Sequence, residues 1–301
     1  MTKSSLFTNE EASDPAYINV RAAENEITRK AKQQCEVLWD QYEEYADNEF
    51  RVELRNNFDA RYWEMYLTVS LIDMGFSVTC PKPDPDVGIQ YKGQRIWFEA
   101  TSLTRGLDGT ADQVPERISA KAGEEPVVYQ VPNELLILRY LNGISEKYMR
   151  QLPRWLKNGA VTDEDALVIA INPRSLGFEH ADTLPPRILQ TAFNLGAPYA
   201  TFDRQSLAIV ETGYQFRNQI LKASGNAVSS GIFHLEEYCQ LSGLLCSRID
   251  VVNQPRSLGA DYQLVPNPNA ANPLPANFRI RGTYFRVDQI EDQYKVIPEQ
   301  C

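Results

Sequence analysis

The chain has 301 residues, of which 43% are hydrophobic and 23% are charged, and its formal net charge is −10. Five scattered cysteines, two histidines and no CxxC pair give almost no basis for a zinc site. No apolar run approaches the roughly 18 residues of a membrane span, and the polar start lacks the apolar core of a signal peptide. We therefore expect a cytoplasmic protein with no membrane partner. The acidic balance alone argues against a nucleic-acid partner, but it does not describe local patches, and bound cations would offset it.

The N-terminal part of the chain is expected to be helical after a disordered tail. Residues 1–17 are polar, and we expect them to be disordered. Over residues 18–47, apolar side chains at helical spacing predict one long amphipathic helix. A second helix is predicted from residue 50 or 58 to residue 74, because Gly75 is a typical helix stop.

The pattern then changes to that of a β-hairpin. Residues 76–80 form a short β-rich stretch, and prolines follow it. Two further strand-like segments, residues 87–91 and 95–101, flank Lys92-Gly93, which predicts an antiparallel pair joined by a two-residue turn. Residues 104–131 contain several Gly and Pro, and we expect a long loop there.

A strong amphipathic helix is predicted over residues 133–157. The fully apolar segment 166–171 follows it and is typical of a central strand buried on both faces. The remaining predictions are a helix near 186–195, strands near 206–211, 231–234 and 244–252, and a last hairpin around 278–287. We expect an α/β fold in a single domain over residues 18–301, with its core at about 58–171 and a C-terminal elaboration over 172–301.

Two acidic residues occupy facing positions in the predicted hairpin. If Lys92 and Gly93 form the turn, Asp86 lies directly opposite Glu99, with Cβ atoms ~4.5–5.5 Å apart. Two like charges in that position are destabilising unless a cation lies between them, and the surrounding strands are mostly apolar. Hard oxygen ligands of this kind favour Mg²⁺, with Mn²⁺ as a second candidate. The alternative is that both carboxylates face solvent and that the turn differs by one residue.

The predicted order of elements from residue 58 to 171 is helix, strand, strand, strand, helix, strand. With Pro85-Asp86 opening the second strand and Glu99-Ala-Thr101 inside the third, this segment resembles the PD-(D/E)XK nuclease superfamily. The resemblance covers a little over a third of the chain. It implies a restriction-endonuclease-like αβββαβ core with a mixed sheet, in which Asp86 and Glu99 bind Mg²⁺.

Two further residues follow from the resemblance. Many members of the superfamily add a Glu from the helix before the first strand, and Glu64 occupies that place here. The alternative for Glu64 is an ordinary position on the helix surface. The superfamily's Lys, two residues after the Glu, is replaced by Thr101, and a hydroxyl cannot supply positive charge to the reacting phosphate.

The helix predicted over residues 133–157 is the obvious source of the missing cation. Lys147 lies just beyond one edge of its apolar face, with Gln151 as a neighbour, so Lys147 is the predicted substitute. The alternative is an exposed Lys whose stem covers apolar surface. The cationic side chains of this helix also form a candidate track for a phosphate backbone: Arg139, Lys147, Arg150, Arg154 and Lys157.

The resemblance implies metal-dependent hydrolysis of phosphodiester bonds in nucleic acid, by a DNA endonuclease that is either a monomer or a homodimer. Asp86, Glu99 and Glu64 would bind the metal, and Lys147, Thr101 and Gln151 would complete the site. Two alternatives remain open. The chain is an inactive nuclease-like fold that binds nucleic acid or protein, or it acts on other phosphoesters, such as nucleotides.

Overall fold

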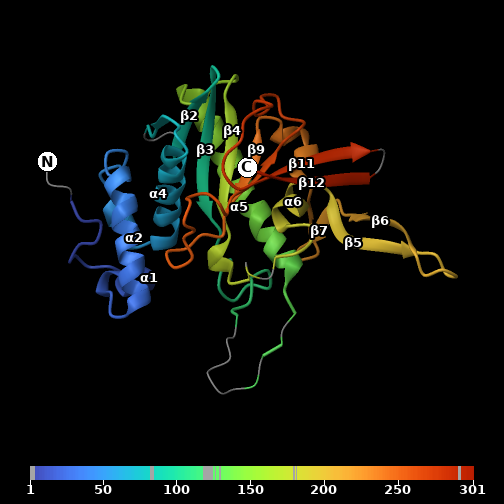
Figure 1. The fold of residues 1–301 in the computed structure, drawn as a ribbon, viewed down its shortest axis with the longest axis horizontal. Helices are drawn as coiled ribbons and strands as arrows, with labels where there is room; N and C mark the ends of the chain where they lie inside the picture. The colour runs from blue at the N-terminus through green and yellow to red at the C-terminus, as the bar shows by residue number, and fades with distance from the viewer. Residues whose placement is uncertain are drawn as a thin grey trace.

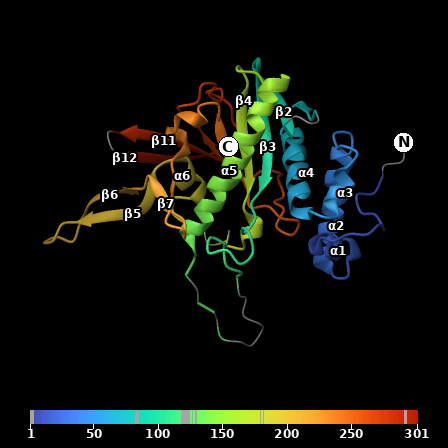
Figure 2. The same ribbon diagram turned by 180° about the vertical axis from the view of Figure 1, so that it is seen from behind.

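A mixed sheet of eight strands forms the centre of the molecule, and helices cover both of its faces (Figures 1 and 2). The computed structural model describes residues 4–81, 85–117, 125, 127–128, 130–178, 180, 182–290 and 293–301. The fold is therefore α/β, as the sequence predicted. Among the helices of these described residues, none is long and apolar enough to cross a membrane.

The first half of the sheet contains the predicted hairpin and the predicted central strand. Its strands are β1 (Val78–Thr79), β2 (Val87–Tyr91), β3 (Gln94–Ser102) and β4 (Ala166–Asn172). The second half consists of β9 (Gly243–Cys246), β10 (Gln263–Pro266), β11 (Thr283–Ile290) and β12 (Gln293–Gln300), and the spatial order is β1-β2-β3-β4-β9-β10-β11-β12. The pairs β3–β4, β4–β9 and β10–β11 are parallel, and the other neighbours are antiparallel.

The hairpin has the predicted turn and register. Lys92 and Gly93 have φ of 50° and 89°, as a two-residue hairpin turn of the primed type requires. Val87 faces Phe98 across the pair, so the next position outward places Asp86 opposite Glu99. β4 is buried along its whole length, which agrees with the prediction of a central strand.

Side chains alternate along β3 between two hydrophobic cores, as the period of a strand requires. Ile96, Phe98 and Ala100 belong to the core beneath the N-terminal helices. Trp97 belongs to the core on the opposite face. Glu99 lies between Phe98 and Ala100, so it shares the face of Trp97.

Four helices form the layer on the first face. They are α1 (Pro15–Ala22), α2 (Glu26–Tyr42), α3 (Phe50–Leu54) and α4 (Phe58–Asp73). Figure 1 shows α4 between the sheet and the other three, which explains why the middle of α4 is buried all round. The prediction of one helix over residues 18–47 was wrong. The chain turns at Ala23, whose φ is 52°, and Asn25 and Thr28 form a capping box that starts α2.

The expected disorder of residues 1–17 was also wrong for the described residues 4–17. Leu6, Phe7 and Tyr17 are buried in the core of the first face. The Glu36 carboxylate of α2 accepts a hydrogen bond from the Leu6 amide at 2.9 Å. These few apolar side chains are enough to anchor a segment whose average composition is polar.

Asp14 connects this segment to the helix next to the sheet. Its Oδ1 accepts hydrogen bonds from the Ala16 and Tyr17 amides at 2.8 and 3.1 Å and so caps α1. Its Oδ2 accepts a hydrogen bond from the Phe58 amide at 2.9 Å, at the start of α4. One carboxylate therefore satisfies the N-terminal amides of two helices, and it holds the first turn of α4 in place.

On the opposite face, α5 (Asn133–Asn158) and α6 (Arg187–Ala192) cover the sheet (Figure 2). The predicted helix over residues 133–157 is confirmed as α5, with Pro153 inside it. The predicted helix near 186–195 is shorter than expected because β5 already begins at Leu195.

The C-terminal half departs most from the sequence-based expectations. β5 (Leu195–Phe202) and β6 (Ile209–Phe216) form a hairpin that projects from the body (Figure 1), and β7 (Gln219–Leu221) pairs with β8 (Ala227–Ser229). The strand expected at 231–234 is a 3-10 helix over Ile232–His234. The last hairpin lies at 283–300 instead of 278–287, because Phe278 and Ile280 belong to the core of the first face.

If residues 4–17 are part of the core, Leu6→Ala should lower the free energy of unfolding by about 2–4 kcal/mol, the usual cost of truncating a buried Leu. The matched control is Ile27→Ala on α2, because the Ile27 side chain is 66% exposed. Its change should stay within about 0.5 kcal/mol. Urea unfolding of both variants measures this difference, and equally small effects would mean that the segment is not packed.

Candidate metal centre

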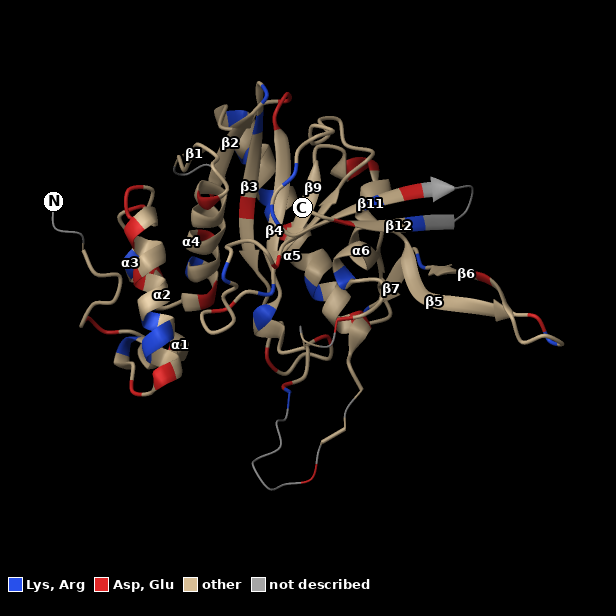
Figure 3. Ribbon diagram, viewed as in Figure 1, with Lys and Arg blue, Asp and Glu red and all other residues tan. Residues whose placement is uncertain are grey.

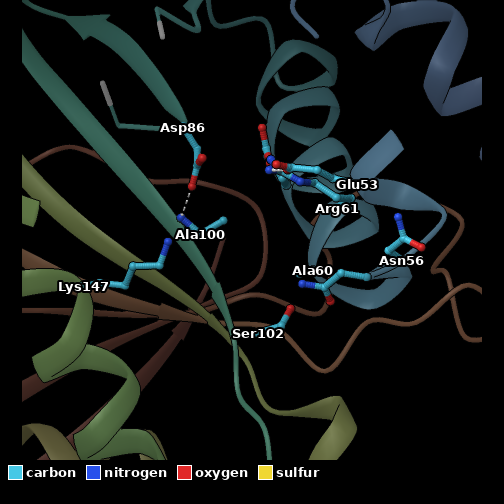
Figure 4. A pocket seen from close by; sticks show the side chains of 10 residues that line it. Glu53, Asn56, Ala60, Arg61, Asp86, Ala100, Ser102 and Lys147 are labelled. Carbon is cyan, nitrogen blue, oxygen red and sulfur yellow. Dashed lines mark hydrogen bonds and ion pairs between the residues drawn. The ribbon is translucent and has the colours of Figure 1, made fainter. Parts of the chain in front are cut away.

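A cavity of about 430 Å³ opens beside β3, at the end where β2 begins (Figure 4). One wall is formed by the α3–α4 region and the other by β3, by the residue before β2 and by α5. Its lining residues are Glu53, Asn56, Asn57, Ala60, Arg61, Glu64, Asp86, Ala100, Ser102 and Lys147.

The site begins where the pairing between β2 and β3 stops. β2 starts at Val87, so the backbone of β3 beyond Phe98 has no strand partner on that side. Asp86 takes the place of a strand there, because its Oδ2 accepts a hydrogen bond from the Ala100 amide at 2.8 Å. The Asp86 amide lies 3.4 Å from Glu99 Oε2. The register thus brings the two predicted acidic residues to the same open strand edge.

Lys147 reaches this edge from α5, on the face of the sheet to which Glu99 belongs. Its Nζ donates a hydrogen bond to Glu99 Oε1 at 2.7 Å. Burial lowers the pKa of the Lys147 ammonium, but the charges of Glu99, Asp86 and Glu64 and the hydrogen bond to Glu99 together outweigh burial, so the pKa is raised. Lys147 therefore stays protonated at neutral pH, and it can neutralise negative charge but cannot act as a base.

Glu64 is buried, so its alternative placement on the helix surface is wrong. The Tyr42 hydroxyl donates a hydrogen bond to Glu64 Oε1 at 2.8 Å, and Arg61 forms an ion pair with Glu64 Oε2. Burial, reinforced by the Glu64 charge, raises the pKa of the Tyr42 phenol, which keeps it a donor. Glu64 lines the cavity, and its two oxygens bind Tyr42 and Arg61.

Arg61 is the functional candidate that the sequence analysis missed. Its guanidinium contacts both Glu53 and Glu64, and Figure 4 shows it across the cavity from Asp86 and Lys147. Burial lowers the pKa of Arg61, but the Glu64 charge and hydrogen bond outweigh it and raise the pKa overall. The available signal was the i,i+3 spacing of Arg61 and Glu64, which places an opposite charge one turn from the predicted ligand.

The other predicted site residues, Glu99, Thr101 and Gln151, are not among the residues that line the cavity. Thr101 and Gln151 are both half-buried, and neither is among the lining residues. Thr101 faces α5 at the point where Gly143 passes close to β3. Ser102, the next residue of β3, lines the cavity instead because it lies on the opposite face.

Negative charge dominates around the cavity. Figure 3 shows an acidic position within β3 and charges of both signs on the neighbouring α4. Four carboxylates, those of Glu53, Glu64, Asp86 and Glu99, surround two cations, Arg61 and Lys147, so the formal charge is −2. A bound cation would compensate this excess.

The donor set restricts which ion would fit. Within the described part of the chain, no group of three or more His, Cys, Asp or Glu side chains is arranged to hold a metal. The pair available is Asp86 and Glu99. Mg²⁺ is often held by one or two carboxylates while it keeps several waters, so this pair fits Mg²⁺ or Mn²⁺ and not a structural zinc site.

Comparisons of the chain with protein-family models, with curated proteins and with solved structures find no match.

The ion pair between Lys147 and Glu99 should stabilise the protein. Lys147→Met would leave the Glu99 carboxylate, which is only 5% exposed, without its cation. Because the Lys147 side chain is 31% exposed and solvent screens the pair, we expect a loss of about 1–3 kcal/mol in the free energy of unfolding. Urea unfolding in EDTA measures this loss.

Arg150→Met provides the control on the same helix. Arg150 pairs with Glu146 at 3.0 Å, but both side chains are exposed, so this change should cost less than about 0.5 kcal/mol. A loss in Lys147→Met no larger than that in Arg150→Met would contradict a stabilising pair at Glu99.

Proposed function

We propose that this protein is a nuclease that depends on a divalent metal and hydrolyses phosphodiester bonds in DNA. The observation that carries the proposal is the convergence of Asp86, Glu99 and Lys147 at the unpaired edge of β3. Two acidic residues and a protonated amine at one strand edge are the groups that metal-assisted phosphoester hydrolysis uses.

The order of elements supports the same function. From α4 to β4 the chain runs helix, strand, strand, strand, helix, strand. Asp86 immediately precedes the second strand, and Glu99 lies inside the third. We propose that this segment is a restriction-endonuclease-like core. Thr101 stands where the motif has its Lys, and Lys147 supplies the missing positive charge. It can do so because Lys147 on α5 and Thr101 on β3 lie on the same face of the sheet.

Each residue would have a distinct task. Asp86 and Glu99 would hold Mg²⁺ or Mn²⁺, which supplies a water of lowered pKa and positive charge near the phosphate. Lys147, protonated at neutral pH, stabilises the negative charge that develops on the phosphate. Glu64 and Glu53 keep the Arg61 guanidinium in the opposite wall.

One observation favours a second function, that of a binding module without cleavage. Glu99 and Glu64 are both neutralised by basic side chains of the same chain. A site whose carboxylates are satisfied in this way can persist without a metal. This alternative predicts binding of nucleic acid or protein that is insensitive to EDTA.

Cleavage of DNA in Mg²⁺ or Mn²⁺ should depend on the two proposed ligands and on Lys147. Asp86→Asn and Glu99→Gln should reduce the rate at least ~100-fold because they remove a ligand charge, and Lys147→Met should reduce it by about 10²–10³-fold. Glu146→Gln is the matched control, since Glu146 is an exposed neighbour of Lys147 on α5. Rates on plasmid and oligonucleotide substrates give these values.

Thermal unfolding should remain cooperative in all four variants, so that a loss of rate reports on the site. Cleavage that persists at the wild-type rate in Asp86→Asn and Glu99→Gln would sink the nuclease proposal. No cleavage by the wild-type protein with either metal, together with DNA binding in EDTA, would instead favour the binding module.

A further inference from the structure

Both oxygens of the Glu99 carboxylate are already engaged within the protein. Oε1 accepts the hydrogen bond from Lys147 at 2.7 Å, and Oε2 lies 3.4 Å from the Asp86 amide. Glu99 is only 5% exposed, so water contributes little to its solvation. Each oxygen has a further lone pair, but a cation that binds Oε1 would share this oxygen with the Lys147 ammonium.

Of the two partners, Lys147 is the one that can leave. The Asp86 amide is fixed by the backbone next to β2, whereas Lys147 ends a flexible four-carbon stem whose side chain is 31% exposed. Lys147 and a divalent cation would also repel each other if both stayed on the same carboxylate. Charge and geometry thus make simultaneous binding unfavourable.

We propose that Lys147 and the divalent cation compete for Glu99, so that metal binding transfers the Lys147 ammonium from Glu99 to the substrate phosphate. This inference rests on the proposed metal site and adds that the metal binds before Lys147 contacts the phosphate. Without metal, Lys147 stays paired with Glu99. With metal, the ammonium is released inside the same cavity, which it already lines opposite Arg61 (Figure 4).

The consequence for substrate is a cation that becomes available only in the loaded site. An anionic phosphate would be attracted both by a cation held at Asp86 and Glu99 and by the released ammonium of Lys147. Before loading, three carboxylates of the lining and the neighbouring Glu99 outnumber two paired cations, and this excess of negative charge would repel the same phosphate. Lys147 therefore links metal loading to phosphate binding.

Mn²⁺ binding to the full chain, followed by electron paramagnetic resonance without nucleic acid, tests the competition. Lys147→Met should bind Mn²⁺ at least about tenfold more tightly than the wild type, which corresponds to about 1.4 kcal/mol. Arg150→Met, in which an exposed cation of the same helix is removed, should bind as the wild type does. The gain should disappear in the Glu99→Gln background, where adding the Lys147→Met change should leave the affinity for Mn²⁺ unaltered.

The outcomes separate this inference from the proposed function. Equal or weaker Mn²⁺ binding by Lys147→Met would overturn the competition and leave the nuclease proposal standing. Tighter binding by Lys147→Met in a protein that cleaves no DNA would support the competition while the nuclease proposal fails. Absence of Mn²⁺ binding in every variant would overturn both.

A second measurement uses the wild-type protein and does not depend on how a variant folds. In ¹⁵N spectra of lysine ammonium groups, the signal that Lys147→Arg removes identifies Lys147. Saturating Mg²⁺ should shift this signal as its hydrogen bond to Glu99 breaks. The Ala100 amide signal reports metal binding at Asp86, because this amide donates a hydrogen bond to the Asp86 carboxylate. If Mg²⁺ shifts the Ala100 signal but leaves the Lys147 signal unchanged, the competition is overturned.

Discussion

The candidate site depends on the point at which β2 stops pairing with β3. Beyond Phe98 the amides of β3 have no strand partner on that side, and a buried amide without a partner is costly. The Asp86 carboxylate supplies this partner, because it accepts a hydrogen bond from the Ala100 amide. The same bond holds an acidic group next to Glu99. Asp86 therefore has two roles: it satisfies a backbone amide of β3, and it places a second acidic residue beside Glu99.

Groups from opposite layers meet at this edge because a strand edge is accessible from both faces of a sheet. Lys147 arrives from α5 and Arg61 from α4, although these helices cover different faces. Each cation is already paired with a carboxylate, which limits the electrostatic cost of burying like charges together. The packing of α4 between the sheet and α1–α3 fixes one wall, and Asp14 fixes the first turn of that wall.

Local patterns predicted the parts of the structure that local interactions determine. The turn at Lys92-Gly93 and strand alternation are short-range properties, so they gave the register that faces Asp86 with Glu99. Helical periodicity placed Lys147 just beyond one edge of the apolar face of α5. Arg61 was missed because its contact with Glu53 depends on how α3 packs against α4. The C-terminal strands were misplaced because contacts with distant segments define them. The burial of Leu6 likewise depends on α2, which a count of polar residues does not consider.

The helix that carries Arg61 and Glu64 also has partners far along the chain. Trp63 donates a hydrogen bond to the Ala170 carbonyl at 3.0 Å, across 107 residues, and Tyr66 donates one to Asp261 at 2.9 Å, across 195 residues. During synthesis from the N-terminus, α4 leaves the ribosome long before either partner exists. Trp63 and Tyr66 can form these two hydrogen bonds only after their partners have been synthesised. The helical wall of the cavity is thus synthesised early, but two of its hydrogen bonds require residues 170 and 261, which are synthesised much later.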